Sequence, residues 1–172
     1  MRRLRYQVAT SLDGYIAGPN GEVDWIVHDP DINFSELFGT FDTAVMGRKT
    51  FEAMLAQTAG AMPGLDVVVY SNKLRPTDYP DVTVINSDPI KHVQSLKAKA
   101  GKDIWLFGGG ALFRTFLQAG LVDTVEPAVV PVLLGSGVPM LSAPYLKTTL
   151  VLTKQRVYEK SGIVLLEYSV HL

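Results

Sequence analysis

Residues 104–117 read IWLFGGGALFRTFL, an apolar run that passes directly into three glycines and then into a segment of helical periodicity. Ile104–Phe107 predicts a strand that is covered on both faces, because none of its residues is polar. The helix that follows is expected to bury Leu112, Phe113, Phe116 and Leu117 and to end at Gly120. A strand, a glycine turn and a helix in this order predict one unit of an α/β sheet.

The same alternation of apolar runs and helical periodicity extends over the rest of the chain. Further strands are expected at residues 4–12, 43–46, 65–70, 82–85 and 124–134. Helices are expected around three apolar sets: Phe34, Leu37, Phe38 and Phe41; Phe51, Met54 and Leu55; and Ile90, Val93 and Leu96. Thr50 is a candidate cap for the second helix, and Asp88 before Pro89 is typical of the start of the third. Residues 149–158 and 163–170 alternate around a short turn, which predicts a β-hairpin.

This order of elements predicts the fold class. Alternating strands and helices imply right-handed crossovers, and hence a mixed, mostly parallel sheet with helices on both faces. The C-terminal hairpin adds antiparallel strands at one edge of that sheet. Because no repeat, low-complexity stretch or linker interrupts the chain, we expect residues 1–172 to form a single α/β domain, a sandwich of three layers.

The composition excludes several classes of function. Sixteen basic and seventeen acidic residues leave a formal net charge of −1, which offers no electrostatic attraction to nucleic acid or an anionic membrane. Without cysteine the chain has no thiolate nucleophile or sulfur-ligated metal, and His28, His92 and His171 are too scattered to suggest a metal site. Neither a signal-peptide pattern nor an apolar run long enough to span a bilayer is found, so we expect a cytoplasmic protein.

Two segments combine a strand end, glycine and a helix start: Gly47–Thr50 and Gly108–Leu112. Glycine lets the backbone approach a phosphate closely, and the helix N-terminus that follows attracts an anion. Each segment also fits a plainer interpretation, a tight turn for the three glycines and a solvated helix start for Arg48 and Lys49. Taken together, they favour a nucleotide with two separated phosphate groups. The planar guanidinium of Arg48 suits a 2′-phosphate, which indicates NADPH rather than NADH.

Four motifs carry a resemblance to a known family. They are SLDGYIA at 11–17, GRKTFE at 47–52, FGGG at 107–110 and PVLLGSGVPML at 131–141. The chain resembles the dihydrofolate reductase-like superfamily, and most of all the reductase domain of the riboflavin-biosynthesis deaminase–reductases, the RibD C-terminal family. This resemblance implies a dihydrofolate reductase-like fold, a homodimer, and NADPH as the cofactor, without a metal.

The resemblance also assigns residues to the cofactor. It implies that Ala9, Ile16 and Ala17 lie against the nicotinamide and its ribose. It implies that Gly47, Arg48, Lys49 and Thr50 hold the pyrophosphate and the 2′-phosphate, and that Ser71 and Asn72 help to bind the ribose phosphate on the adenine side. The segment of Gly108, Gly109, Gly110, Ala111 and Leu112 would close over the pyrophosphate from the other side.

On the substrate side the sequence offers three candidate residues. Asp31 stands sixteen residues before Gly47, which is the spacing of the carboxylate that supports protonation in dihydrofolate reductases, so the resemblance makes Asp31 a catalytic candidate. Asp31 equally fits a helix N-cap before Ile32. Asp24 and Trp25 are candidates for substrate binding, because an indole offers a flat wall to a planar heterocycle and a carboxylate can bind its edge. Trp25 also fits ordinary core packing.

Two departures from the related families bear on the substrate. Folate reductases follow a Pro-Gly turn with an arginine that binds the folate carboxylate, whereas Leu65 follows Pro63 and Gly64 here. Riboflavin-type reductases need cations for the ribose phosphate of their substrate, and no arginine pair beyond Arg48 clearly serves. We therefore expect an NADPH-dependent oxidoreductase that resembles 5-amino-6-(5-phosphoribosylamino)uracil reductase and transfers hydride to a small heterocyclic substrate. A divergent dihydrofolate reductase and a non-catalytic nucleotide-binding module are the alternatives.

Overall fold

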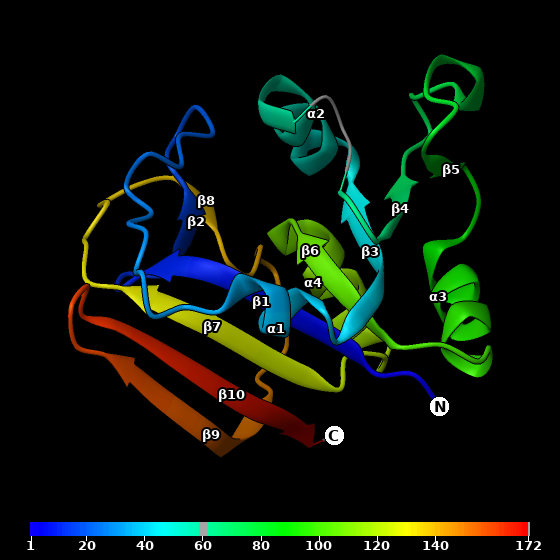
Figure 1. The fold of residues 1–172 in the computed structure, drawn as a ribbon. Coiled ribbons are helices and arrows are strands. Elements are labelled where there is room, and N and C mark those ends of the chain that lie inside the picture. Colours follow the sequence, from blue (N-terminus) through cyan, green and yellow to red (C-terminus); the bar gives the residue numbers. More distant parts are fainter. Residues whose placement is uncertain (59–61, 172) are drawn as a thin grey trace.

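The centre of the structure is a sheet of eight strands in the order β5-β4-β3-β6-β1-β7-β10-β9 (Figure 1). The computed structural model describes residues 1–58 and 62–171. The strands are β1 (Leu4–Ser11), β3 (Phe41–Gly47), β4 (Asp66–Tyr70), β5 (Thr83–Ile85), β6 (Asp103–Gly108), β7 (Thr124–Val130), β9 (Thr149–Tyr158) and β10 (Ile163–His171). Neighbouring strands pair in parallel except at β10, which is antiparallel to β7 and β9. The predicted mixed, mostly parallel sheet with a C-terminal antiparallel hairpin is confirmed.

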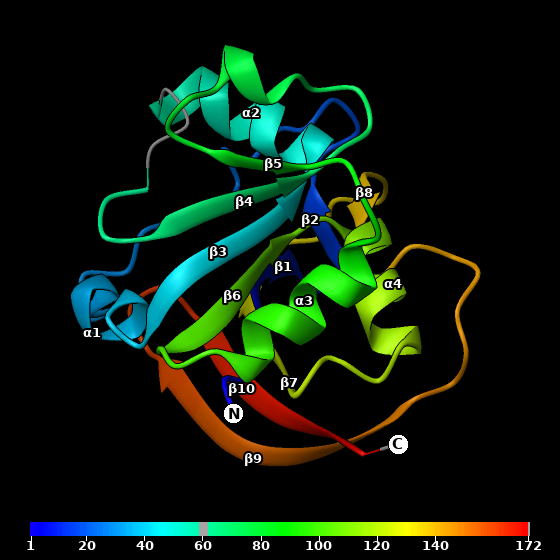
Figure 2. The ribbon, with the colours of Figure 1, turned by 90° about the vertical axis from the view of Figure 1, so that its right-hand side faces the viewer.

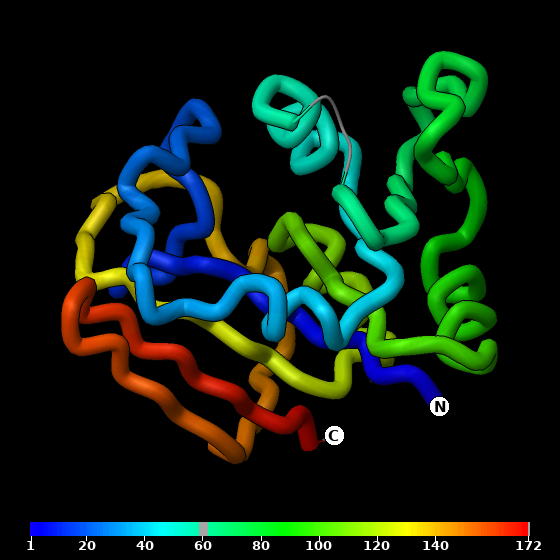
Figure 3. The backbone as a smooth tube through the Cα atoms, in the orientation of Figure 1, coloured from blue at the N-terminus to red at the C-terminus, as the bar shows by residue number. Residues whose placement is uncertain are grey.

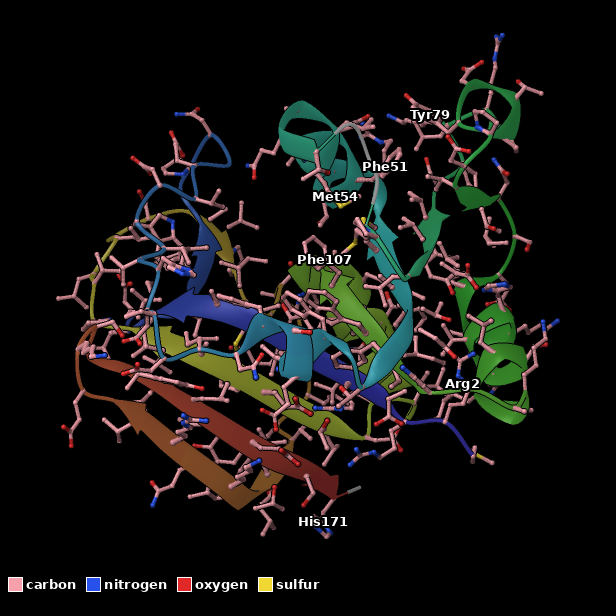
Figure 4. All side chains as sticks on the ribbon, in the orientation of Figure 1. Arg2, Phe51, Met54, Tyr79, Phe107 and His171 are labelled. Carbon is pink, nitrogen blue, oxygen red and sulfur yellow. The ribbon has the colours of Figure 1, made fainter. Side chains whose placement is uncertain are left out.

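Helices cover both faces of this sheet. In Figure 2, α3 (Pro89–Ala98) and α4 (Gly110–Gln118) lie in front of the central strands; α1 (Phe34–Phe38) and α2 (Arg48–Thr58) pack on the opposite face. Strand alternation produces the two cores, because Val45 packs with the α3–α4 layer while Ala44 and Met46 pack with α2. Figure 4 shows Phe51 and Met54 between α2 and the strands. The predicted sandwich of three layers is confirmed.

Several local predictions are also confirmed. Asp88 is the N-cap of α3, and its carboxylate accepts a hydrogen bond from the backbone N–H of Ile90 at 2.9 Å. Gly120 follows α4 with a φ of +68°, the left-handed conformation expected after a helix. A short 3-10 helix, η1 (Pro76–Asp78), lies between β4 and β5.

The helix predicted from Phe34 to Phe41 is shorter than its periodicity indicated. α1 ends at Phe38 with Gly39 as its C-cap, and Phe41 is the first residue of β3. Phe41 is buried because it packs against Trp105 of β6, with ring centroids 5.6 Å apart. The helical spacing of Phe41 was therefore a coincidence, and a strand contact explains its burial.

Two further boundaries differ from the prediction. α2 begins at Arg48, so Thr50 lies inside the helix and does not cap it. The strand expected at 124–134 ends at Val130, immediately before Pro131.

The structure also has a second sheet of two short strands, which the sequence did not predict. β2 (Tyr15–Ala17) pairs antiparallel with β8 (Val138–Pro139), and Figure 3 shows these segments rising together beyond the carboxyl end of β1. Gly137, with a φ of +151°, passes so close to the carbonyl oxygen of Ala17 that any Cβ there would collide with it. The close approach of the two segments therefore requires glycine at this position.

None of the helices in residues 1–58 and 62–171 is long and apolar enough to cross a membrane. The same residues contain no group of three or more His, Cys, Asp or Glu side chains arranged to hold a metal ion.

Candidate active site

The residues assigned to the cofactor lie along one edge of the sheet. β4, β3, β6 and β1 are parallel neighbours, so their carboxyl ends lie together. Ser71 follows β4, Gly47–Thr50 begins at the end of β3, and Gly108–Leu112 begins at the end of β6. Ligands of open α/β sheets bind at this edge. The structure thus gathers the predicted set around one position.

The two glycine segments lie against each other. A Cβ placed on Gly109 would lie 3.3 Å from Oγ1 of Thr50, so the side chain of Thr50 covers the turn after β6. A Cβ on Gly110 would lie 2.5 Å from the carbonyl oxygen of Pro139, and Gly108 has a φ of +141°. The sequence predicts two separated phosphate cradles, whereas the structure has two adjacent ones on neighbouring strands. Adjacent cradles suit two phosphates that share a bridging oxygen.

Both α2 and α4 present open N-termini at this edge. Gly109 precedes α4 without a side-chain capping bond, and neither helix has an acidic residue in its first turn. The first-turn N–H groups and the helix dipole favour a negatively charged group by about 0.3–1 kcal/mol at a protein surface. A Cβ on Gly47 would have no atom within 4 Å, so the backbone there is open to a ligand. These residues fit a pyrophosphate.

Arg48 supplies a cation beside the two N-termini. Its Nη1 donates to both carboxylate oxygens of Glu52, one turn along α2, at 2.8 Å. An exposed pair at this spacing contributes only about 0.3–0.5 kcal/mol, so a phosphate can replace Glu52 as the partner of Arg48 at little cost. Lys49, the next residue, is exposed. The start of α2 therefore offers two cations to a phosphate group.

Ser71 and Asn72 form the turn after β4. The hydroxyl oxygen of Ser71 accepts hydrogen bonds from the backbone N–H groups of Lys73 and Leu74, both at 3.1 Å. Its lone pairs thus shape the turn, while its hydrogen can still be donated to a ligand. Asn72 is exposed, and the pairing of Gly47 with Tyr70 places this turn next to the start of α2.

Ala9, Ile16 and Ala17 lie on the other side of the glycine turns. Ala9 is on β1, where it packs against the cluster of Val130, Tyr158 and Ile163. Ile16 and Ala17 are half-buried in β2. These small and apolar side chains give the site an apolar wall on the β1 side.

Asp13 ties two of the recognised motifs together. Its carboxylate accepts hydrogen bonds from the Ser11 hydroxyl at 2.6 Å and from the backbone N–H groups of Leu134 and Gly135 at 3.1 and 2.7 Å. These bonds, that of Ser11 above all, hold the pKa of Asp13 below its ordinary value. The SLDG and LLGSG segments therefore bond to each other, which fixes the β2–β8 pair beyond β1.

Trp25 and Asp24 lie on the connection between β2 and α1. The indole N–H of Trp25 donates to the carbonyl oxygen of Glu22 at 3.0 Å, and its ring packs partly against the Val130 cluster. Asp24 is exposed. The core packing expected of Trp25 is observed, and its half-buried ring keeps one part accessible.

Asp31 lies in the loop before α1 and does not cap that helix. The N-cap is Asn33, whose side chain accepts from the backbone N–H of Glu36 at 3.1 Å, so the alternative interpretation of Asp31 as a helix cap was wrong. Asp31 is exposed, and Lys160 of the β9–β10 turn donates to its carboxylate at 2.9 Å. The structure therefore places Asp31 against the C-terminal hairpin.

Asp29, two residues earlier, is fully buried. Its carboxylate accepts from the backbone N–H groups of Asp31 at 2.8 Å and Ser161 at 3.0 Å. Hydrogen bonds from Ser161 hold its pKa below the ordinary value despite burial. Asp29 thus fastens the loop that carries Trp25 to the C-terminal hairpin.

The sequence interpretation missed a polar row on the α1 face of the sheet. Arg5 on β1 and Glu126 on β7 form a buried ion pair, and Gln7 is 6% exposed beside them. Oε1 of Gln7 has no hydrogen-bond partner within the described residues. A signal for this row was available in the sequence. Leu4–Val8 alternates apolar or aromatic with polar residues, and a central strand covered on both faces must bury its polar residues too.

An aromatic wall stands next to this polar row. Trp105 of β6 stacks on Phe38 of α1 with ring centroids 4.8 Å apart and meets Phe107 edge to face at 4.9 Å. Figure 4 shows Phe107 in the middle of the molecule. The indole N–H of Trp105 donates to the backbone oxygen of Gln7 at 2.9 Å, which joins the wall to β1.

Comparisons with known proteins show the family to which this chain belongs. The family model of the RibD C-terminal domain matches residues 2–164. Among curated proteins, Uncharacterized protein YyaP of Bacillus subtilis (strain 168) is 35% identical over 178 residues, which cover 97% of this chain and 94% of that protein.

Solved structures extend the likeness to the fold. The putative riboflavin biosynthesis protein from Shewanella sp. PV-4 has a TM-score of 0.83 and 28% identity, with 100% of both chains covered. Dihydrofolate reductase from Enterococcus faecalis, solved in complex with NADP(H) and RAB-propyl, has a TM-score of 0.72 at 20% identity, covering 99% of this chain and 97% of that one. The fold is therefore dihydrofolate reductase-like. On the match over residues 2–164, this chain belongs to the RibD C-terminal domain family.

Proposed function

We propose that this protein is an NADPH-dependent reductase that transfers hydride to a small molecule containing a nitrogen heterocycle, and that it resembles 5-amino-6-(5-phosphoribosylamino)uracil reductase in this chemistry. One observation carries the proposal: the N-termini of α2 and α4 are open and follow glycines at the ends of the paired strands β3 and β6. Arg48 lies beside them. Such a pair suits the pyrophosphate of a dinucleotide, and the guanidinium suits an additional 2′-phosphate. The RibD C-terminal family model and a structural neighbour described as a 5-amino-6-(5-phosphoribosylamino)uracil reductase support the same chemistry.

Different residues of the chain would bind different parts of the cofactor. Backbone N–H groups at the starts of α2 and α4 would donate to the pyrophosphate, and Arg48, Lys49, Ser71 and Asn72 would hold the 2′-phosphate. Ala9, Ile16 and Ala17 would pack against the nicotinamide and keep water from it. When bound, NADPH supplies the hydride. The protein supplies alignment of the two rings and a proton.

The substrate would bind on the β1–β7 side of the glycine turns. We propose that Asp24 and Trp25 contact the ring and that Asp31 supplies the proton. The pair of Asp31 and Lys160 is exposed at both side chains, so opening it costs little. Asp29 holds the loop that carries Asp31 against the C-terminal hairpin. Leu65 packs in the apolar cluster of α2, where a folate reductase would need a cation for the folate tail, so folate is disfavoured as substrate.

We further propose that two copies of the chain associate through β9. It is an edge strand, and its apolar side chains Leu150, Val151, Leu152 and Val157 are exposed. It adjoins a hollow of about 460 Å³ between α4 and residues 140–150, where Tyr145 and Leu146 are also exposed. An apolar surface at a sheet edge favours association with another chain. Light scattering should give twice the mass of 18.8 kDa, and Leu152→Lys should give a monomer; a monomeric wild-type protein contradicts the proposal.

The test of the reductase function has two stages. NADPH and NADH are first titrated separately into the protein and followed by fluorescence, and NADPH is expected to bind more tightly. Candidate heterocycles are then added, and the loss of NADPH absorbance is measured. Equal affinity for the two cofactors would contradict the role of Arg48. Tight NADPH binding without reduction of any heterocycle would favour a non-catalytic binding module.

A further inference from the structure

Within residues 1–58 and 62–171, Gln7 carries the buried side-chain atom that lacks a hydrogen-bond partner. The residue is 6% exposed, and the unpartnered atom is its Oε1. The backbone oxygen of Gln7 is already used, because it accepts from the indole of Trp105. A buried amide oxygen without a donor is rare in native proteins, since its lost hydration is not replaced. Oε1 of Gln7 can therefore accept a hydrogen bond from a donor group of a bound ligand.

Strand geometry places Gln7 in the substrate half of the site. Alternate residues of a strand point to the same face, so Gln7 lies between Arg5 and Ala9 on the α1 side of β1. The ladder pairs Gln7 with Glu126 of β7. Both oxygens of Glu126 already accept hydrogen bonds from Arg5, so Gln7 is the member of this row that is left with an unused acceptor.

The aromatic wall flanks Gln7 on the opposite side. β6 is the other neighbour of β1, and its Trp105 and Phe107 lie there with Phe38 of α1. A flat apolar surface beside a single buried amide suits a planar ring that carries hydrogen-bonding groups on one edge. Ala9, next along the face of β1, is the residue proposed to meet the nicotinamide. A ring at Gln7 would thus lie close to the hydride donor.

We infer that Gln7 determines substrate specificity by binding a lactam edge, which is a ring N–H next to a ring carbonyl. Oε1 accepts from the ring N–H, and Nε2 donates to the ring carbonyl, as an amide side chain does with any edge that offers one donor and one acceptor. The inference rests on the proposed function, because it requires the ring to enter between the aromatic wall and Ala9.

The amide of Gln7 also selects against a basic ring. A 2,4-diaminopyrimidine offers adjacent donors and becomes protonated, so a carboxylate binds it best. The carboxylate next to Gln7 belongs to Glu126, and its charge is balanced by the guanidinium of Arg5 at 2.7 Å. A neutral edge is therefore preferred. Uracil has the required lactam edge, whereas 1,3-dimethyluracil has the same ring without an N–H.

The experiment compares these three probes by NMR. Uracil, 1,3-dimethyluracil and 2,4-diaminopyrimidine are titrated into ¹⁵N-labelled protein saturated with NADP⁺. Uracil should shift the side-chain amide signals of Gln7 and bind about tenfold more tightly than 1,3-dimethyluracil, the effect of one lost hydrogen bond in a buried site. Gln7→Met should lower the affinity for uracil about tenfold and leave that for NADPH and 1,3-dimethyluracil unchanged. Gln7→Glu should reverse the preference in favour of 2,4-diaminopyrimidine.

Tyr6→Phe is the matched control, because it removes a partly buried hydrogen bond to the carbonyl oxygen of Met140 from the opposite face of the same strand. It should leave the ranking of the three probes unchanged. Equal affinity of the wild type for uracil and 1,3-dimethyluracil would overturn the inference, and so would an unaltered uracil affinity in Gln7→Met. If that variant does not fold, the wild-type spectrum is the test: the inference requires that uracil shift the side-chain amide signals of Gln7, and unshifted signals would overturn it. If NADPH and NADP⁺ do not bind at all, the proposed cofactor role fails, and the uracil titration of the protein alone still decides the role of Gln7.

Discussion

Arg5 on β1 and Glu126 on β7 are joined by two parallel hydrogen bonds, from Nε to Oε1 at 2.7 Å and from Nη2 to Oε2 at 2.8 Å. The hydroxyl of Thr124 also donates to Oε1 at 2.5 Å, and the guanidinium lies 4.6 Å from the ring centre of Phe41. The pair is buried, and hydrogen bonds within it and from Thr124 satisfy both oxygens of the carboxylate. It therefore neutralises the charges in the polar row next to Gln7.

Glu126→Ala should destabilise the fold strongly. It leaves the buried guanidinium of Arg5 without its main partner, and breaking a buried ion pair from one side costs about 3–5 kcal/mol. Urea denaturation measures the change in the free energy of unfolding. The matched control is Lys160→Ala, which breaks the exposed pair with Asp31 and should cost less than about 1 kcal/mol. Similar losses in the two variants would show that the pair of Arg5 and Glu126 does not support the sheet.

Gly110→Ala and Gly47→Ala should have opposite consequences. A Cβ at Gly110 meets the carbonyl oxygen of Pro139 at 2.5 Å, so this variant should lose about 1–3 kcal/mol of stability. A Cβ at Gly47 meets nothing within 4 Å, so the melting temperature should change little, while NADPH affinity should fall because the methyl group enters the open approach to the backbone. Thermal unfolding and NADPH titration of both variants test this pair of outcomes. Unaltered NADPH affinity in Gly47→Ala would remove Gly47 from the cofactor site.

The sequence predicted the sheet, its helices and its glycine turns because these depend on local patterns. Ile104–Phe107 is apolar throughout, and Asp88 stands at the start of α3 where a cap is needed. The gathering of Gly47 and Gly108 at one edge follows from parallel pairing of β3 and β6. That part of the site could therefore be predicted once the strands were recognised.

The parts that were not predicted depend on contacts between distant segments. Phe41 has helical spacing from Phe34, but its burial comes from Trp105, more than sixty residues away. The β2–β8 pair is held by Asp13 and the backbone of residues 134 and 135, and no periodicity in either segment indicates it. Gln7 reads as a solvent-facing residue of an alternating strand. Its burial follows only once β1 is known to be an inner strand of the sheet with cover on both faces.

Asp29→Asn should reduce stability in a way that depends on pH. Because hydrogen bonds hold the pKa of Asp29 below the ordinary value of about 3.9, the folded state binds its proton less readily than the unfolded state. The stabilisation by Asp29 is fully present above that ordinary pKa and is lost as the pH falls through the folded pKa. Melting temperatures of the wild type and Asp29→Asn should therefore differ at neutral pH and converge below about pH 4. A difference that stays constant over this range would mean that the charge of Asp29 does not hold the loop.

Arg48→Ala should weaken the binding of NADPH by at least about tenfold and leave NADH unchanged, because a charge-assisted hydrogen bond to a phosphate contributes about 1.5–3 kcal/mol. The preference for NADPH in the wild type should also decrease with added salt, since the contact is exposed. Glu52→Ala is the control, because it removes the partner that now occupies Arg48 and should preserve or raise NADPH affinity. Equal losses for NADPH and NADH in Arg48→Ala would place the guanidinium at the shared pyrophosphate, and the preference would then have to arise from Lys49 or from the turn of Ser71 and Asn72.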